Sequence, residues 1–441
     1  MSSARELALE LSRRASSTCV LVVQQEDEGE GRLTKSVLLD EYAASNVVFC
    51  RLSELEALTT KAARFSAVVL NSVLGDLQEN HNKFDRVTLG HVVGIALTLL
   101  TDNGTLLCRQ NMASAENPFT PAKFTDFFDL YRVKTENEGT VGLSFYSLRS
   151  LESSVQSSRN WSDFMWTLRK KEYEPVQAGA RLTERDFLDS TQYRTDGIAA
   201  YEFIFGKGFI SPGGAEKNLE FARALQLRPQ QHVLDVGCGI GGGALQLARE
   251  FGVLSTGVDL SSNMVALAWA EANRVKDTRV RFFVADVLQY DFEENAFDAI
   301  LSRDCVQHIS NKRLLFRRCY EVLKPGGRML ITSYMKGEGR PSAEYAAYLK
   351  ARQYSMDTLD EFVHCATEAG FSQIRGVDMT ADFQTILINE MSRGRRDEAE
   401  FVRRFSQQKF DSLIEGWDAK LRYIASNNLV WGMLYAVKPL L

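Results

Sequence analysis

The stretch VLDVGCGIGGG, Val233–Gly243, joins a short apolar run to a turn that contains five glycines. Glycines at positions 237, 239 and 242 form the pattern G-x-G-x-x-G directly after the apolar run. This pattern is typical of a buried strand, a tight turn and a helix, with glycines where a ligand approaches the backbone. It predicts a nucleotide-type ligand but does not distinguish a dinucleotide from S-adenosylmethionine.

Three acidic residues discriminate between these ligands. Asp235 lies inside the motif, Asp259 follows in STGVDLSSNM, and Asp286 follows in VRFFVADVLQ, each at the end of an expected strand. Asp259 is spaced to bind ribose hydroxyls, which both cofactors carry. Asp235 and Asp286 would repel a pyrophosphate but attract the amino group, sulfonium and adenine amine of S-adenosylmethionine. The acids therefore favour S-adenosylmethionine.

Length and composition limit the remaining possibilities. The 441 residues suffice for two domains, and the formal charge of −5 is spread without the basic stripe that nucleic-acid binding needs. No run is long enough to cross a membrane, and the charged start MSSARELALELSRR lacks the apolar segment of a signal peptide, so we expect a cytoplasmic protein. Seven dispersed cysteines predict free thiols, and five histidines without ligand spacing predict no metal site.

The two halves of the chain share an order of motifs. FDAILSRD (297–304) precedes VLKPGGRMLIT (322–332) in the second half, and FSAVVLNS (65–72) precedes LLTDNGTLLCR (99–109) in the first. Ahead of them, VLVVQQEDEG (20–29) occupies the place of the glycine motif. The pattern favours a repeat, although two unrelated α/β domains would also share buried strands and glycine turns.

If the halves correspond, the first has lost its ligand site. Val22 then replaces Asp235, and Gln24 and Glu26 replace the first two glycines of the motif, so side chains block the close backbone approach. We therefore expect a degenerate domain without a cofactor site at residues 1–150. A Ser-rich, charged linker is expected at 151–180, and the catalytic domain at 181–441.

The motifs LDVGCGIGGG, GVDLS, ADV, FDAILSRD and LKPGGRMLI, within residues 233–332, resemble those of class I S-adenosylmethionine-dependent methyltransferases. The resemblance implies an α/β fold with a doubly wound, Rossmann-like sheet and the ligand at the carboxyl ends of its strands. It also implies contacts to the methionine part, the ribose and the adenine of the cofactor. These contacts are assigned to Gly237, Gly239, Asp259, Leu260, Asp286 and Val287.

The flanking segments carry a narrower resemblance. QYRTDG, YEFIFGKGFISPGG, SRDCVQHI and YLKARQYS are similar to the phosphoethanolamine methyltransferases of plants, nematodes and protozoan parasites, across 181–441. A degenerate first domain resembles the nematode form that acts on the monomethylated substrate. The resemblance implies conversion of phosphomonomethylethanolamine to phosphodimethylethanolamine and then phosphocholine. It implies S-adenosylhomocysteine as by-product and small-molecule partners only, and we expect a monomer.

The same resemblance assigns the remaining site residues. From spacing alone, Asp304 and His308 share one face if a helix begins after the strand, and Tyr348 and Arg352 share a helical face. The resemblance makes Tyr193 and His308 the catalytic pair. It adds four residues to the cofactor site: Gln192, Ser211, Arg303 and Asp304. It assigns the phosphobase to Gln192, Tyr193, Asp304, Tyr334, Tyr348, Arg352, Tyr354 and Lys420.

Two other functions remain compatible with parts of this pattern. A methyltransferase of this class could act on a sterol, another lipid or another small molecule, but the cluster of tyrosines with Arg352 and Lys420 favours a phosphate. A non-catalytic protein whose two domains serve assembly is the other alternative. The intact Gly237, Asp259 and His308 argue against it.

Overall fold

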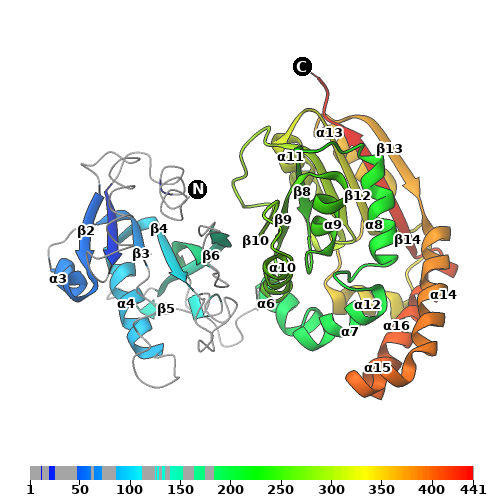
Figure 1. The fold of residues 1–441 in the computed structure, drawn as a ribbon, viewed down its shortest axis with the longest axis horizontal. Coiled ribbons are helices and arrows are strands. Elements are labelled where there is room, and N and C mark those ends of the chain that lie inside the picture. The colour runs from blue at the N-terminus through cyan, green and yellow to red at the C-terminus, as the bar shows by residue number, and fades with distance from the viewer. Residues whose placement is uncertain are drawn as a thin grey trace. The chain divides into compact units, whose positions relative to one another are not determined.

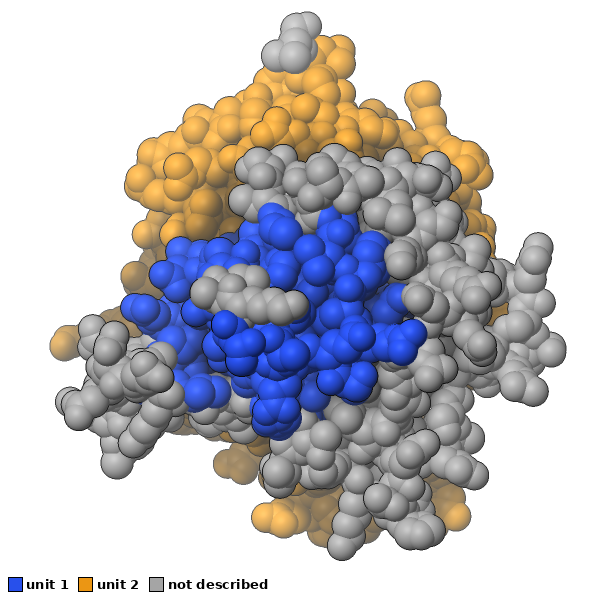
Figure 2. Space-filling view, turned by 90° about the vertical axis from the view of Figure 1, so that its left-hand side faces the viewer, with its two compact units in different colours: residues 1–181 blue, residues 182–441 orange. Residues whose placement is uncertain are grey.

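The computed structural model of the chain describes residues 11, 19–24, 47–60, 64–71, 86–111, 125, 127–128, 132–134, 140–151, 163–173 and 183–440. The chain divides into two compact units, Met1–Arg181 and Leu182–Leu441 (Figures 1 and 2). No helix within these described ranges combines the length and apolar composition needed to cross a bilayer.

The second unit is built on a mostly parallel sheet with the strand order β13-β14-β12-β11-β8-β9-β10. Strands β8 to β12 run parallel, and β14 runs antiparallel to both β12 and β13. The strands are β8 (His232–Val236), β9 (Leu254–Asp259), β10 (Val280–Ala285), β11 (Phe297–Arg303), β12 (Leu323–Lys336), β13 (Ser372–Asp378) and β14 (Leu429–Val437). The order reverses direction between β8 and β11, where doubly wound sheets bind ligands. The predicted α/β fold class is confirmed.

Helices connect these strands along the chain. They are α6 (Glu184–Phe187), α7 (Thr195–Phe205), α8 (Gly214–Ala224), α9 (Gly242–Phe251), α10 (Ser262–Val275), α11 (Lys312–Val322), α12 (Ala343–Arg352), α13 (Leu359–Glu368), α14 (Thr380–Arg396), α15 (Glu398–Arg404) and α16 (Gln407–Ala425). Helices α14, α15 and α16 contact one another, and α14 and α16 contact β14 (Figure 1). The ring of Trp431 on β14 packs against helices on the sheet, because it contacts Phe221 of α8 and Phe383 of α14.

The first unit repeats this strand order in a shorter form. Its strands follow the order β6-β7-β4-β3-β1-β2, with β5 paired to β6. The elements are β1 (Val20–Gln24), β2 (Val47–Arg51), α3 (Leu55–Thr59), β3 (Phe65–Asn71), α4 (Arg86–Leu99), β4 (Leu100–Asn111), β5 (Arg132–Lys134), β6 (Thr140–Leu151) and β7 (Asp163–Tyr173). Strands β1, β3 and β4 therefore occupy the positions that β8, β11 and β12 occupy in the second unit.

Strand registers agree with the sequence alignment of the two halves. Val20 of β1 lies opposite Ala67 of β3, and Val233 of β8 lies opposite Ala299 of β11. In this register Val22 matches Asp235, and Val22 is fully buried. Gln24, the last residue of β1, is also buried. Glu26, which the alignment matches to Gly239, lies outside the described residues.

Part of the expected linker is a strand instead. Residues 163–173 form β7, which pairs antiparallel with both β4 and β6 and therefore belongs to the first unit. Its residues 164–168 are all buried, and Trp166 Nε1 donates to Thr125 Oγ1 over 3.0 Å. The prediction of a linker at these residues was wrong because it gave more weight to the charged residues of TLRKKEY than to the short apolar run FMWTL.

Candidate active site

A pocket in the second unit lies at the carboxyl ends of β8 to β12. It collects side chains that are up to 236 residues apart in the sequence, from Glu184 to Lys420. All the predicted site residues except Gln192 line this pocket: Tyr193, Ser211, Gly237, Gly239, Asp259, Leu260, Asp286, Val287, Arg303, Asp304, His308, Tyr334, Tyr348, Arg352, Tyr354 and Lys420. The residues inferred for cofactor, base and phosphate thus share one site.

The glycine turn after β8 requires glycine for two separate reasons. Gly237 and Gly239 have φ angles of 75° and 53°, a conformation that other residues rarely adopt. A Cβ atom on Gly237 would also lie 2.3 Å from Sγ of Cys305, and one on Gly242 would lie 2.1 Å from the carbonyl oxygen of Gly208. The turn therefore has no room for a side chain at Gly237 or Gly242.

Two carboxylates near the glycine turn, buried Asp235 and half-buried Asp259, have raised pKa values. Burial raises the pKa of Asp235 to about 7, with Arg303 opposing this shift and Asp259 adding to it. Burial raises the pKa of Asp259 to about 6, although its oxygens accept 2.9 Å hydrogen bonds from the backbone N–H groups of Gly239 and Ser261. A cationic ligand would stabilise both ionised forms, so this end of the pocket favours positive charge.

Asp286 follows β10 at the edge of the same pocket. Its Oδ1 accepts from the backbone N–H of Leu288 over 2.9 Å, and its Oδ2 accepts from Gln289 Nε2 over 2.6 Å. These bonds hold the carboxylate at the turn, beside Val287 of the pocket wall.

The predicted catalytic pair is in direct contact. The hydroxyl of Tyr193 lies 3.0 Å from Nε2 of His308, and the ring of Tyr354 meets the imidazole edge-on with centroids 4.8 Å apart. Burial, together with the charges of Arg352 and Lys312, lowers the pKa of His308 to about 4. Burial also raises the pKa of Tyr193 well above 10. At neutral pH the pair is therefore a neutral imidazole beside a neutral phenol.

Asp304 and His308 do not share the face of an α-helix, which corrects that expectation. His308 ends a three-residue 3-10 helix, Val306–His308, and Asp304 stands before it with φ of 51°. The left-handed residue turns the chain sharply at the end of β11, so a regular helix does not start there. Gln307 Nε2 donates to the Asp304 carbonyl over 2.5 Å and stabilises the turn.

The Asp304 carboxylate is held on one side only. Its Oδ1 accepts from Trp431 Nε1 over 2.7 Å and from Thr332 Oγ1 over 3.1 Å. Its Oδ2 is buried and has no hydrogen-bond partner among the described residues. Burial raises the pKa of this carboxyl, against the opposing effect of Arg303. A ligand that brings an N–H group or a positive charge would satisfy the free oxygen.

The opposite end of the pocket carries two cations among tyrosines. Helix α12 places Tyr348 one turn before Arg352, and Lys420 Nζ on α16 donates to the hydroxyl of Tyr334 over 3.2 Å. Burial and the charge of Arg352 lower the pKa of Lys420 to about 8. Tyr354 lies between Tyr348 and Tyr334, with ring centroids 5.8 Å and 6.4 Å away. The two half-buried cations repel each other, so a dianion would be stabilised between them.

Arg303 and Gln192 contact the protein itself. Arg303 donates to the carbonyls of Pro212 and Gly214 over 2.8 and 3.0 Å, so it supports the turn that carries Ser211. Gln192 donates from Nε2 to the carbonyl of Arg352 over 2.7 Å, while its Oε1 is buried without a partner among the described residues. Gln192 thereby connects the Tyr193 segment to the end of α12.

Sequence reasoning missed several residues that shape the site. Tyr201 lines the pocket and hydrogen-bonds Arg352, and buried Glu390 of α14 accepts from Gly213 N over 2.8 Å. Trp431 and Lys312 support Asp304 and the His308 loop from strand β14 and helix α11. The signals available were a tryptophan in an apolar strand and an acid in an amphipathic helix, and neither is specific.

Comparison with known proteins agrees with this geometry. A family described as the N-terminal region of phosphoethanolamine N-methyltransferase 2 matches residues 1–174, and one described as a methyltransferase domain matches residues 234–331. With the glycine turn, the three acids and the strand order, these matches define a class I methyltransferase, the class that takes its methyl group from S-adenosylmethionine.

Relatives narrow the class to one family. The chain is 42% identical over 337 residues to phosphoethanolamine N-methyltransferase 2 of Caenorhabditis elegans, across 76% of this chain and 77% of that protein. It is 34% identical over 259 residues to the enzyme of Plasmodium falciparum, across 58% of this chain and 97% of that protein. The chain belongs to the phosphoethanolamine N-methyltransferase family, as its motifs predicted.

A solved structure extends the similarity to both units. Haemonchus contortus phosphoethanolamine N-methyltransferase 2, in complex with phosphomonomethylethanolamine and S-adenosylhomocysteine, matches with a TM-score of 0.90 and 37% identity. The match covers 100% of this chain and 99% of that one. The degenerate first unit and the second unit therefore both have counterparts in that protein.

Proposed function

We propose that the chain methylates phosphomonomethylethanolamine and then phosphodimethylethanolamine, with S-adenosylmethionine as donor and phosphocholine as final product. The observation that carries this proposal is the polarity of one pocket. Buried Asp235 and half-buried Asp259 stand at one end, half-buried Arg352 and Lys420 at the other, and the Tyr193–His308 pair also lines it. A cationic cofactor and a phosphate-bearing amine match these two ends.

At the cofactor end of the pocket, both backbone groups and carboxylates would contact the cofactor. S-adenosylmethionine supplies a methyl group on a cationic sulfur, which a nitrogen lone pair attacks. Gly237 and Gly239 would let the methionine part approach the backbone, and Asp259 with Leu260 would bind the ribose and adenine. Asp286 with Val287 would bind the adenine at its outer edge. In this role Asp259 keeps the hydrogen bonds from the N–H groups of Gly239 and Ser261 and accepts the ribose hydroxyls with its remaining lone pairs.

The Tyr193–His308 pair would remove the proton that blocks the nitrogen lone pair. An alkylammonium has a pKa of about 10. Transfer of its proton to a base of pKa about 4 is therefore uphill by ~6 pKa units, or ~8 kcal/mol. A phosphate dianion on Arg352 would offset one of the charges that depress the pKa of His308. The difference between the pKa values of the ammonium and of His308 then narrows toward the ~3.5 units, or ~5 kcal/mol, expected for an ordinary histidine.

Two proton routes are consistent with the 3.0 Å contact. In one, Nε2–H of His308 donates to the Tyr193 oxygen, and Nδ1 accepts the ammonium proton. In the other, Tyr193 donates to Nε2 and its oxygen takes the ammonium proton in the same step. Replacing Tyr193 with phenylalanine separates them, because the first route loses only an orienting contact and the second loses the acceptor itself.

Asp304 would hold the amine through its free Oδ2, and its negative charge stays useful after the last methylation, when no N–H remains. Arg352 can bind the phosphate with two parallel hydrogen bonds, and the hydroxyls of Tyr334, Tyr348 and Tyr354 can add further donors. The ammonium group of Lys420 would add a second positive charge beside the phosphate.

We also propose that only the second unit binds the cofactor. Val22 is buried at the position that Asp235 holds in the second unit, and Gln24 stands where the second unit has Gly237. The first strand of the repeat thus offers an aliphatic side chain in place of a carboxylate and a bulky amide in place of a bare turn.

The proposal is tested by incubating the purified chain with S-adenosylmethionine and, separately, phosphoethanolamine, phosphomonomethylethanolamine and phosphodimethylethanolamine. Mass spectrometry should find phosphocholine from the second and third substrates, and little product from the first. Absence of phosphocholine from both methylated substrates would reject the proposal, and methylation of a sterol instead would replace it.

A further inference from the structure

The segment that carries Tyr193 has an unusual backbone. Residues Leu188–Gln192 form one turn of π-helix between α6 and α7, closed by a 2.7 Å bond from the N–H of Tyr193 to the carbonyl of Leu188. A π-turn adds a residue to the helical turn and is rare, so contacts from outside the segment must favour it. Tyr193 follows directly, and its ring therefore depends on how this turn is held.

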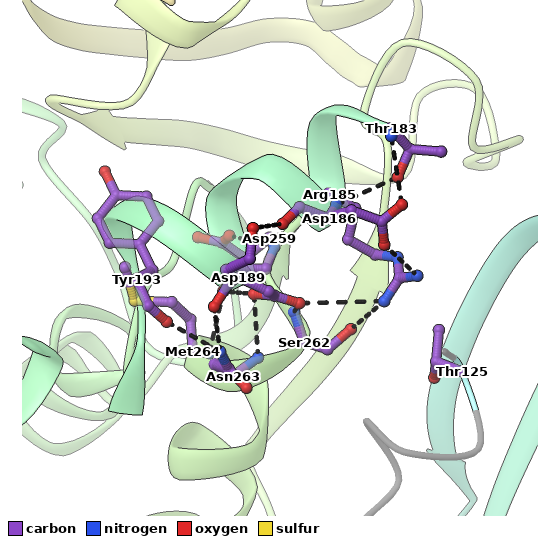
Figure 3. A network of polar contacts seen from close by, with 12 residues as sticks. Thr125, Thr183, Arg185, Asp186, Asp189, Tyr193, Asp259, Ser262, Asn263 and Met264 are labelled. Atoms are coloured by element: carbon purple, nitrogen blue, oxygen red, sulfur yellow. Dashed lines mark hydrogen bonds and ion pairs between the residues drawn. The ribbon is translucent and has the colours of Figure 1, made fainter. Parts of the chain in front are cut away.

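Asp189, within the π-turn, holds the segment against the start of α10. Its carboxylate accepts from Oγ of Ser261, from the backbone N–H of Ser262 over 3.1 Å and from that of Asn263 over 3.4 Å. These N–H groups have no partner inside α10, and a carboxylate there also interacts favourably with the helix dipole. Figure 3 shows Asp189 between the Tyr193 segment and the first residues of α10.

Asn263 makes the same connection in the opposite direction. Its side-chain Nδ2 donates to the backbone carbonyls of Asp189, over 3.1 Å, and of Tyr193, over 2.9 Å (Figure 3). Both hydrogens of one amide thus bridge the beginning of the π-turn and the residue that follows it. The position of Tyr193 is fixed through its own carbonyl.

The other side of this network reaches the cofactor end of the pocket. Asp259 accepts from the N–H of Ser261 through Oδ1 and from the N–H of Gly239 through Oδ2, both over 2.9 Å. The path of hydrogen bonds therefore runs from the glycine turn through Asp259 and Ser261 to Asp189, and from there to the Tyr193 segment.

We propose that Asp189 and Asn263 are positioning residues that couple the two ligand sites, so that cofactor and phosphobase strengthen each other's binding. A ligand that contacts Asp259 orders the start of α10, and that order is passed to the π-turn that aims Tyr193 at His308. By linkage the effect is reciprocal, and a phosphobase held by Tyr193 tightens the cofactor site by the same factor. The inference rests on the proposed function of this pocket.

The test measures coupling rather than activity alone. In the native full-length chain, calorimetry should show phosphomonomethylethanolamine binding about tenfold tighter with saturating S-adenosylhomocysteine than without it. In Asn263→Leu, which keeps the side-chain size and removes both donors, the ratio should fall toward one. The affinity for S-adenosylhomocysteine alone should stay within about threefold of the native value, because Asp259 and the glycine turn remain. The turnover number should fall about tenfold.

Two further variants separate positioning from general damage. Asp189→Asn should lose coupling in the same way, because an amide is a weaker acceptor for the N–H groups of α10. Asp277→Asn is the matched control beyond the other end of α10. Its carboxylate binds Arg279 and stands outside the network, so coupling and turnover should stay native.

The outcomes distinguish this inference from the proposed function. Native coupling in both Asn263→Leu and Asp189→Asn, with phosphobase binding intact, would overturn the inference alone. A native chain that binds no phosphobase with or without S-adenosylhomocysteine would overturn the proposed function and the coupling together. Loss of coupling in the two variants but not in Asp277→Asn would support the inference.

Discussion

Replacing His308 with glutamine should make methylation depend steeply on pH. The native imidazole, with a pKa of about 4 because of burial and of the charges of Arg352 and Lys312, stays unprotonated across pH 7–9. It can therefore accept a proton from bound ammonium over that whole range. Glutamine fills similar space beside Tyr193 but cannot take the proton, so the variant can use only substrate that arrives as free amine.

The size of the effect follows from the ionisation of the substrate. With an amine pKa near about 10, the neutral fraction is about 10⁻³ at pH 7 and about 10⁻¹ at pH 9. The kcat/KM of His308→Gln should therefore rise by about 100-fold between these values, whereas the native value should change by less than about tenfold. The native enzyme should exceed the variant by about 10³ at pH 7 and by about 10 at pH 9, within the usual range for general base catalysis.

Initial rates with phosphomonomethylethanolamine, measured at saturating S-adenosylmethionine in buffers of constant ionic strength, give both profiles. Calorimetry with S-adenosylhomocysteine provides the control, because His308 should contribute little to cofactor affinity. Parallel pH profiles for native and variant chains would refute the assignment of the base. The rate would then have to come from positioning and from the charge of Asp304.

Three further outcomes follow from the same geometry. Lys420→Met should raise the KM for phosphobase by about 10- to 150-fold, with S-adenosylhomocysteine affinity unchanged, because a charge-assisted bond contributes about 1.5–3 kcal/mol; a loss of cofactor affinity would move Lys420 out of the phosphate site. Gly237→Ala should weaken S-adenosylhomocysteine binding by at least about tenfold through its clash with Cys305. Gly416→Ala is the control and should leave this affinity unchanged, because the new methyl group on α16 has no neighbouring atom within 4 Å. Equal affinities of the two variants would show that the turn can adjust. Titration of the full chain should find one S-adenosylhomocysteine per chain, and two would show that the first unit retains a site.

The second unit was predictable from sequence because its signals are local. The glycine turn, Asp259 and Asp286 each stand at the end of a short apolar strand, and parallel strands bring such ends to one edge of the sheet. The family resemblance then supplied Arg352 and Lys420, which composition alone would have left as ordinary polar residues of amphipathic helices.

The contacts that orient the catalytic pair were not predictable, because they join segments far apart in the chain. Trp431 holds Asp304 across 127 residues, and Asn263 holds the carbonyl of Tyr193 across 70. The π-turn before Tyr193 and the left-handed Asp304 are also set by these tertiary contacts, because the local sequence is compatible with ordinary helix at both places. In the first unit, β7 was missed because its buried run, residues 164–168, is short and is followed directly by charged residues.

The most direct test of the account is a crystal structure of the chain with S-adenosylhomocysteine and phosphomonomethylethanolamine. This structure should show one molecule of S-adenosylhomocysteine and one of phosphomonomethylethanolamine in the second unit. The phosphate should lie within hydrogen-bond distance of Arg352 and Lys420, and the amine nitrogen about 3 Å from an acceptor of Asp304 or of the Tyr193–His308 pair. A phosphobase bound outside this pocket, or bound with its phosphate turned toward Asp259, would contradict it.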